Sequence, residues 1–156
     1  SLELEESSVQ RYARLFALAR DAGLGTTVHT GETQATNGEG VIAVVKHLKP
    51  HRIGHGIRAA YNEEALKILN GEGVTLEICP TSNLHTRDVS DLVELKHVVE
   101  TFVANDVKIT VNTDGTYLLG TDLRREVELL WRNQILDEAG VASCFANAKA
   151  ASFLVD

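Results

Sequence analysis

The sequence lacks several features that would place a protein in a class at once. Its two cysteines, Cys79 and Cys144, form neither a CxxC pair nor a disulfide framework. With 15 Lys and Arg against 22 Asp and Glu, the net charge is -7, and no basic run could follow a phosphate backbone. No apolar stretch reaches the roughly 20 residues that cross a bilayer. Nucleic acid and membrane are therefore not expected partners, and a reducing, cytoplasmic setting is expected.

The beginning of the chain is acidic and polar, without the basic and apolar regions of a signal peptide. Helical spacing of apolar residues predicts a helix from Val9 to about Ala19, with Ser7 or Ser8 as N-cap and Gly23 as its stop. No strand is predicted before this helix. We interpret residues 1–156 as a single partial domain whose 44% hydrophobic content suffices for a sizeable core.

Strand and helix patterns alternate along the rest of the chain. Strands are predicted at residues 26–29, 52–55, 74–79 and 107–112. Helices are predicted at residues 38–48, 63–70, 92–105, 123–138 and 143–154, with Asn62 capping the second of them. This order indicates right-handed βαβ units and a parallel sheet.

Two α/β architectures fit four such units. One is an open, doubly wound sheet, which would bind its ligand at a switch point between two strands. The other is half of a (β/α)8 barrel, whose complete form needs about 250 residues. All four predicted strands end in polar, chemically capable residues, which suits convergence at a barrel mouth. The sequence therefore favours the half-barrel.

The first of these strand ends carries His29 and Glu32, in the motif HTGE. The histidine could be a metal ligand and the carboxyl group, brought back by the flexible glycine, a proton donor. In the alternative interpretation His29 caps the following helix and Glu32 is a solvated loop carboxylate.

Two further strand ends carry His55, between glycines in RIGHG, and Asp114, in NTDG. A ring at His55 could reach a bound water, and a carboxylate at Asp114 could coordinate a divalent cation. The alternative for Asp114 is an Asp-Gly turn in which the carboxylate binds its own backbone. A histidine alone at a strand end is weak evidence for function.

The remaining polar residues have weaker interpretations. Cys79 is expected to be a packed strand residue, Ser82 and Asn83 to order a loop, and Glu77 to point into the barrel beside a partner that the sequence does not identify. Surface or capping roles are expected for the other histidines, His47, His51, His85 and His97.

Together the strand ends offer imidazole and carboxylate groups, a ligand set suited to zinc, which lowers the pKa of a bound water to about 7. In these residues the sequence resembles the adenosine deaminase family of the amidohydrolase superfamily. HTGE occupies the position of the family's HAGE motif, and RIGHG, CPTSN and NTDG follow in the order and spacing of the family. The tail ANAKAASFL resembles its closing helix, so the resemblance covers essentially the whole chain.

The resemblance implies a zinc enzyme with a (β/α)8 barrel that removes an exocyclic amine from a purine and releases ammonia. By position, His29 and Asp114 match zinc ligands, and Asp114 also touches the attacking hydroxide. Glu32 matches the residue that protonates a ring nitrogen of the purine. His55 matches the residue that orients and deprotonates the attacking water.

Two departures from the family pattern bear on activity. The His-x-His pair that completes the family's zinc site does not occur in this sequence. Gly115 stands where most members have a second aspartate that binds the purine, and Thr116 where proline is common. Three functions stay open: deamination of adenosine or a related 6-aminopurine, nucleoside binding by an inactive relative, and hydrolysis of a different amine or amide.

The resemblance also implies that four preceding βα units are missing from this chain. Two strand edges, at residues 26–29 and 107–112, would then be exposed and would favour association. We expect the chain to function with a complementary amino-terminal half-barrel or to self-associate.

Overall fold

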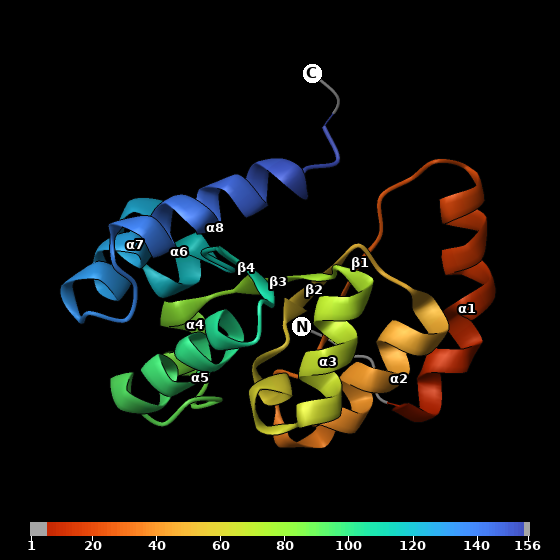
Figure 1. Ribbon diagram of the computed structural model, residues 1–156, viewed down its shortest axis with the longest axis horizontal. Helices are drawn as coiled ribbons and strands as arrows, with labels where there is room; N and C mark the ends of the chain where they lie inside the picture. The colour runs from red at the N-terminus through yellow and green to blue at the C-terminus, as the bar shows by residue number, and fades with distance from the viewer. Residues whose placement is uncertain (1–5, 155–156) are drawn as a thin grey trace.

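The computed structural model of the protein describes residues 6–154 and contains one parallel sheet (Figure 1). The sheet has the order β1-β2-β3-β4, so each strand pairs with the next along the chain. The strands are β1 (Thr27–Thr30), β2 (Arg52–His55), β3 (Thr75–Ile78) and β4 (Lys108–Val111). Each lies at its predicted position to within a residue or two.

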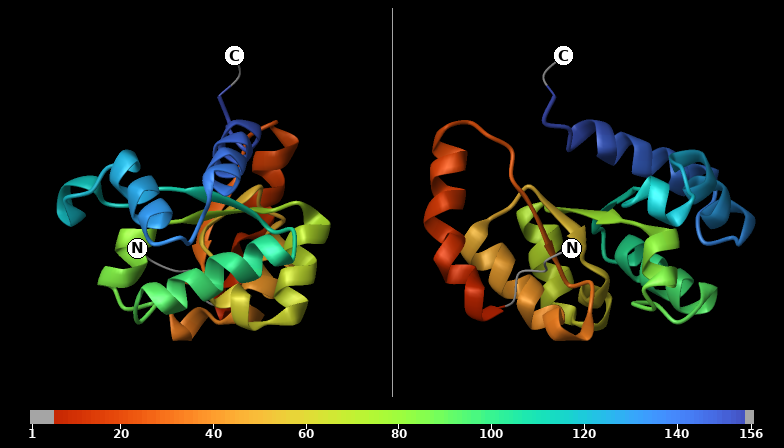
Figure 2. Two further views of the ribbon diagram at one scale, coloured as in Figure 1. Left: turned by 60° about the vertical axis from the view of Figure 1, so that its left-hand side comes forward. Right: turned by 180° about the vertical axis from the view of Figure 1, so that it is seen from behind.

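Helices follow every strand. The α-helices are α1 (Glu6–Asp21), α2 (Gly38–Leu48), α3 (Glu63–Glu72), α4 (Pro80–His85), α5 (Leu92–Ala104), α6 (Thr116–Leu119), α7 (Leu123–Arg132) and α8 (Glu138–Ala150), and two 3-10 turns are η1 (Gln34–Thr36) and η2 (Ile57–Tyr61). The views of the ribbon place α2 and α3 beside β1 and β2, α1 on the outer side of α2, and α6 to α8 beside β4 (Figures 1 and 2). This sequential arrangement is that of half a (β/α)8 barrel, as the sequence favoured, and not of a doubly wound sheet.

The two faces of the sheet differ sharply in polarity. The strand register places residues in rows across the sheet, and neighbouring rows point to opposite faces. One row is apolar, and its members are Val28, Ile53, Leu76 and Ile109. The rows on either side are polar apart from one glycine: Thr27, Arg52, Thr75 and Lys108 below, and His29, Gly54, Glu77 and Thr110 above.

The core lies on the apolar face. Ile53, Leu76 and Ile109 are at most 4% exposed and pack in one cluster with buried side chains of α2, α3 and α5. Burial of each of these side chains contributes roughly 1.5–3 kcal/mol to the free energy of folding. The opposite face, which we call the inner face, is the one that lines the interior in a complete barrel.

Helix caps explain where several helices begin. Asn37, Asn62 and Asp91 precede α2, α3 and α5, and each side chain accepts hydrogen bonds from the first-turn backbone N–H groups. The prediction for Asn62 is therefore confirmed. Gly23, with a φ of 71°, follows α1 as the expected stop.

Three helix predictions were wrong. Ser7 and Ser8 lie inside α1, which already includes Glu6, so neither is its N-cap. The predicted helix 123–138 is interrupted after Arg132, because Gln134 adopts a left-handed backbone with a φ of 54°. The last helix accordingly begins at Glu138, five residues before the predicted start, with Asp137 as its cap.

The outer edge of β4 is partly covered by α8. The Asn112 N–H donates a hydrogen bond to the Ile78 carbonyl of β3. The backbone groups of alternate residues of β4 therefore point toward β3, and those of Ile109 point away from it, to the open edge. Asn147 of α8 donates its side-chain N–H to the Ile109 carbonyl at 3.0 Å. One of the edge groups that the sequence left unpaired is therefore satisfied within the chain.

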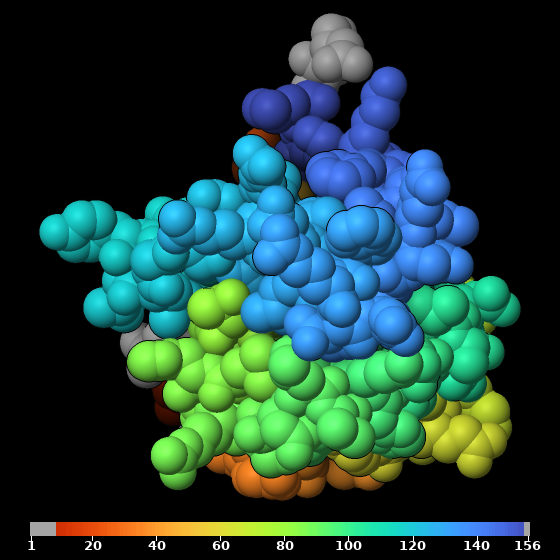
Figure 3. Space-filling model, turned by 90° about the vertical axis from the view of Figure 1, so that its left-hand side faces the viewer, coloured from red at the N-terminus to blue at the C-terminus, as the bar shows by residue number. Residues whose placement is uncertain are grey.

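Two surface observations complete the fold. Within residues 6–154, the helices are too short or too polar to span a membrane. The segment that includes α6 projects from the body of the molecule (Figure 3), and its Tyr117 and Leu118 are 101% and 87% exposed.

Candidate active site

The carboxyl ends of β1 and β2 bring Glu32 and His55 together. After β1 the chain turns at Gly31, where φ is 67° and a Cβ would lie only 2.6 Å from a methyl group of Val41. The turn directs Glu32 inward, where it is 7% exposed, and its Oε2 lies 3.6 Å from His55 Nε2. The alternative in which Glu32 is a solvated loop carboxylate is therefore wrong.

His55 has an unusual backbone and a fixed side chain. Its φ is 61° and that of Gly56 is 69°, a left-handed conformation that costs a non-glycine residue roughly 1–3 kcal/mol. The ring is 1% exposed, and its Nδ1 lies 3.0 Å from Asn83 Nδ2. The same asparagine accepts a hydrogen bond from the Cys79 backbone N–H at 3.2 Å.

His29 lies beside His55 on the inner face. Its ring packs over Gly54 of the neighbouring strand, where a Cβ would approach the ring to 2.6 Å. The centroids of the His29 and His55 rings are 5.3 Å apart. Gly54 thus leaves the space that His29 occupies, and the ring does not cap the following helix, where Asn37 holds that position.

Asp114 follows β4 and also has a left-handed backbone, with a φ of 53°. Its Oδ2 accepts a hydrogen bond from Ser82 Oγ at 2.7 Å. The carboxylate is therefore held by a side chain from another element and not by its own turn.

The short helix α4, where the sequence predicts a loop, connects these residues. Ser82 on α4 contacts Asp114, and its neighbour Asn83 contacts His55. The helix is fixed from outside by Glu126 of α7, which is fully buried and accepts a hydrogen bond from the Thr81 backbone N–H at 2.9 Å. A proline at the first helical position is the signal that could have identified α4.

The site residues are thus linked by contacts across all four strands. His29 lies on β1 and Asp114 follows β4, the two edge strands, and His55, Asn83 and Ser82 lie between them. Within residues 6–154, no group of three or more His, Cys, Asp or Glu could hold a metal ion. The described residues therefore do not form a complete metal-coordination sphere by themselves.

Cys79 is packed, as expected, but it lies at the N-cap of α4 and not in β3. It is 6% exposed, and burial, together with the nearby charge of Asp114, raises the pKa of its thiol to about 12. Glu77, for which the sequence offered no partner, accepts a hydrogen bond from Thr27 Oγ1 at 3.0 Å and lies 3.4 Å from Arg52 Nε. Both residues therefore have structural roles on or near the inner face.

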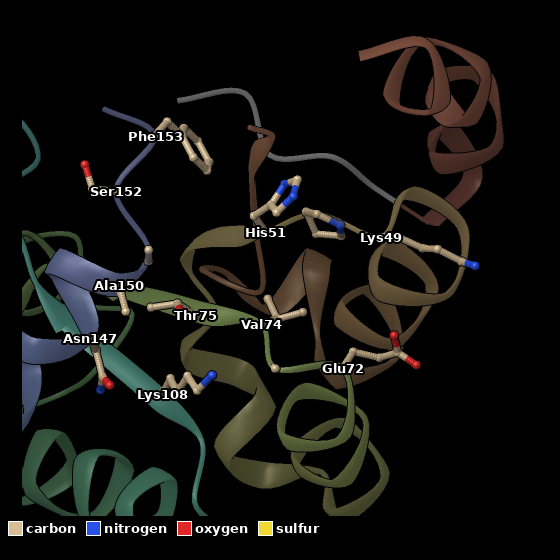
Figure 4. A pocket seen from close by; sticks show the side chains of 13 residues that line it. Lys49, His51, Glu72, Val74, Thr75, Lys108, Asn147, Ala150, Ser152 and Phe153 are labelled. Atoms are coloured by element: carbon tan, nitrogen blue, oxygen red, sulfur yellow. The ribbon is translucent and has the colours of Figure 1, made fainter. Parts of the chain in front are cut away.

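A pocket of about 340 Å³ lies at the other end of the strands, away from this site (Figure 4). Lys49, His51 and Lys108 border it, and Phe153 from the carboxyl-terminal segment closes one side. The Phe153 ring also lies 3.9 Å from the Arg52 guanidinium carbon. This pocket lies at the amino ends of the strands and is therefore separate from the candidate catalytic residues.

Comparison with known proteins agrees with this geometry. An adenine deaminase of Mesorhizobium japonicum is 34% identical over 146 residues, 94% of this chain and 44% of that protein. An aminodeoxyfutalosine deaminase of Streptomyces avermitilis is 41% identical over 139 residues, 89% of this chain and 38% of that protein. The crystal structure of an adenine deaminase of Arthrobacter aurescens superposes on the whole chain with a TM-score of 0.85 and 28% identity, and 46% of it is covered.

These relatives are more than twice as long as the matched segment, so the chain spans less than half of each of them. The family profile for adenosine deaminase matches residues 2–156, nearly every residue of the sequence. The four strand-end motifs, the sequential parallel sheet and this match all indicate the same family. The chain belongs to the adenosine deaminase family and corresponds to the carboxyl-terminal half of its amidohydrolase-type barrel.

Proposed function

We propose that this chain supplies the carboxyl-terminal half of the active site of a zinc-dependent deaminase, which replaces the amino group of a 6-aminopurine by oxygen and releases ammonia. The observation that carries the proposal is the 3.6 Å approach of Glu32 Oε2 to His55 Nε2 at the carboxyl ends of β1 and β2. In parallel α/β barrels, this end of the strands holds the catalytic groups.

Glu32 is the proton donor to the purine. Attack of water at the carbon that bears the amine moves negative charge onto the adjacent ring nitrogen, and a positioned acid that protonates this nitrogen lowers the barrier. Glu32 suits the role because it is buried, 7% exposed, and is held beside His55. Low solvent exposure strengthens its interaction with a substrate atom.

His55 orients the attacking water. Its ring is 1% exposed and fixed by Asn83 on one side, so that its other nitrogen faces Glu32. The backbone of His55 is left-handed, with a φ of 61°. A fixed ring holds the water in position for attack without further ordering, which is a large part of the catalytic advantage.

His29 and Asp114 would hold the zinc ion. Their imidazole and carboxylate groups are donors that zinc accepts, but catalytic zinc sites normally have three protein ligands, and residues 6–154 offer no group of three. The donor chemistry fits and the donor count is incomplete, so further ligands have to come from outside these residues. When bound, zinc would lower the pKa of a coordinated water to about 7.

A complementary amino-terminal half-barrel would supply the missing ligands. Parallel sheets are normally covered on both faces, whereas the inner face of this sheet carries Arg52 and Glu77, which are partly exposed, and Lys108, which is exposed. The chain also covers only 44% of the adenine deaminase and 38% of the aminodeoxyfutalosine deaminase to which it is similar. Both observations support a barrel completed by further chain.

The relatives differ in the substrate that their names state, adenine in one and aminodeoxyfutalosine in another. We therefore propose a 6-aminopurine as the substrate class. Gly115, next to Asp114, is the position at which the substrates of this family would be distinguished. A Cβ there would meet only Leu118 Cβ, at an ordinary contact distance of 3.7 Å, so sterics do not require the glycine.

The test is an ammonia-release assay on the chain assembled with an amino-terminal half-barrel of the family. Adenine, adenosine and bulkier 6-aminopurines are offered in turn, before and after removal of metal by a chelator. Release from at least one purine, lost with the metal and restored by zinc, is expected. An assembled barrel that retains zinc and binds a nucleoside without releasing ammonia would establish the inactive relative instead. Ammonia from a non-purine amine only would redirect the assignment.

A further inference from the structure

We propose that Asn83 is a positioning residue that holds the hydrogen of the neutral His55 ring on Nε2. The inference rests on the proposed function and refines it, because it decides what His55 can do to a water molecule. It depends on the contacts of one fully buried side chain, which is 0% exposed and touches both a backbone group and the His55 ring.

The orientation of the Asn83 amide is fixed by the backbone. The Cys79 N–H can only donate a hydrogen bond, and it lies 3.2 Å from Asn83 Oδ1. A flipped amide would place its own N–H₂ group against this donor and leave two buried donors facing each other. The carbonyl oxygen of Asn83 therefore faces Cys79, and its nitrogen faces His55.

This orientation determines the tautomer of His55. Asn83 Nδ2 carries only hydrogens and lies 3.0 Å from His55 Nδ1, so Nδ1 has to accept the hydrogen bond. An imidazole ring with a bare Nδ1 carries its hydrogen on Nε2. That nitrogen is the one that lies 3.6 Å from Glu32 Oε2.

The consequence is that His55 donates a hydrogen bond into the site. With its hydrogen on Nε2, the ring can hold the oxygen of the attacking water or the Glu32 carboxylate, but it cannot accept a proton on that nitrogen. The resemblance to the family implied that the residue at this position deprotonates the water. In this chain Asn83 assigns His55 to orientation of the water by hydrogen-bond donation.

The experiment reads the tautomer directly. The chain is labelled with ¹⁵N-histidine and assembled with an unlabelled amino-terminal half-barrel, and a long-range ¹H–¹⁵N spectrum reports which His55 nitrogen carries hydrogen. The wild-type residue is expected to show it on Nε2. In Asn83→Asp the new carboxylate still accepts from Cys79 N–H, but it presents an acceptor to His55, so hydrogen is expected on Nδ1.

The matched control is His85→Ala, which changes an exposed residue of the same helix, α4, at a distance from the hydrogen bonds of the site. Its His55 spectrum should match the wild type. Hydrogen on Nδ1 of the wild-type ring, or an unchanged ring in Asn83→Asp, would overturn the proposal. Because the spectrum does not depend on turnover, a failure of the deamination assay with the expected tautomer would reject the proposed reaction and leave the role of Asn83 intact.

Discussion

Ser82 Oγ donates a hydrogen bond to Asp114 Oδ2 at 2.7 Å, and this contact joins the short helix after β3 to the turn after β4. It engages one oxygen of the carboxylate and leaves the other for a ligand. Asp114 is exposed and its backbone is left-handed, so the serine is the contact that defines the direction of its side chain. Hydrogen bonds of this kind orient metal ligands and tune their affinity.

Replacement of this serine should weaken metal binding without unfolding the protein. In Ser82→Ala, Asp114 loses its partner, and the zinc affinity of the assembled barrel is expected to fall by roughly 10- to 100-fold. Competition with a chromophoric chelator measures the change. Ser143→Ala, an exposed serine on α8, is the control and should bind zinc as the wild type does. Equal affinities in the two variants would show that Ser82 does not position a ligand.

Gly54 should tolerate no side chain. A Cβ would lie 2.6 Å from the His29 ring, so Gly54→Ala is expected to displace His29, to reduce zinc affinity and to lower the free energy of unfolding by about 1–3 kcal/mol. Gly71 in α3 has no atom within 4 Å of such a Cβ. Gly71→Ala should therefore raise the free energy of unfolding by about 0.5–1 kcal/mol. Urea denaturation compares the two, and a harmless Gly54→Ala would mean that the His29 ring lies elsewhere.

Glu32→Gln separates proton donation from metal binding. The amide keeps the size of the side chain but is a far weaker acid, so kcat of the assembled barrel is expected to fall by about 10²- to 10⁴-fold while zinc content stays unchanged. Metal analysis and ammonia release are measured on the same preparation. Glu72→Gln, at the other end of the strands, serves as control. Unchanged turnover in Glu32→Gln would remove Glu32 from the mechanism.

The buried thiol of Cys79 should make stability fall in alkali. Burial raises its pKa to about 12 from an ordinary value near 9. Between these values the unfolded chain loses the proton and the folded chain keeps it, so the contribution is present below pH 9 and is lost as the pH rises toward 12. At pH 10 the wild type should have lost roughly 1 kcal/mol more of its free energy of unfolding than Cys79→Ser, relative to pH 8. Urea unfolding at pH 8 and pH 10 measures the difference, and an equal loss in both proteins would contradict the prediction.

An aspartate at position 115 should improve purine binding. The backbone of Gly115 has a φ of -84°, which any residue adopts, and the space beside it is open. If the site binds a purine ring, Gly115→Asp adds one hydrogen bond and should raise kcat/KM about three- to tenfold for the preferred substrate. Gly115→Ala is the matched control for the change in backbone. A loss of activity in the aspartate variant alone would indicate a substrate that is not a purine.

The sequence predicted the strands because they depend on local pattern. Apolar residues mark each strand, and polar residues stand at its end or shortly after it, so Glu32, His55 and Asp114 could be proposed as candidates without coordinates. Helix α4 was missed because its polar sequence resembles a turn, although Pro80 at its start was a usable signal. The break between α7 and α8 depends on the backbone of Gln134, which has no glycine or proline to announce it.

The contacts that fix the site could not be predicted in the same way. Asn83 lies 28 positions from His55, and Ser82 lies 32 positions from Asp114, so only the register of three strands and the placement of α4 bring them together. Glu126 is a further example, because a carboxylate on α7 stabilises a helix that begins 46 residues earlier. Such pairs depend on tertiary geometry, which no local pattern encodes.

The polar rows on the inner face limit how this unit can be reused. An engineer who wished to turn it into a self-contained domain could not simply lay an apolar helix over the sheet, because the guanidinium of Arg52, the carboxylate of Glu77 and the amine of Lys108 would all lose water. Two copies fused head to tail would instead bring like rows opposite each other. A working chimera therefore needs a second half whose charges complement this face, and that requirement sets the first criterion for choosing one.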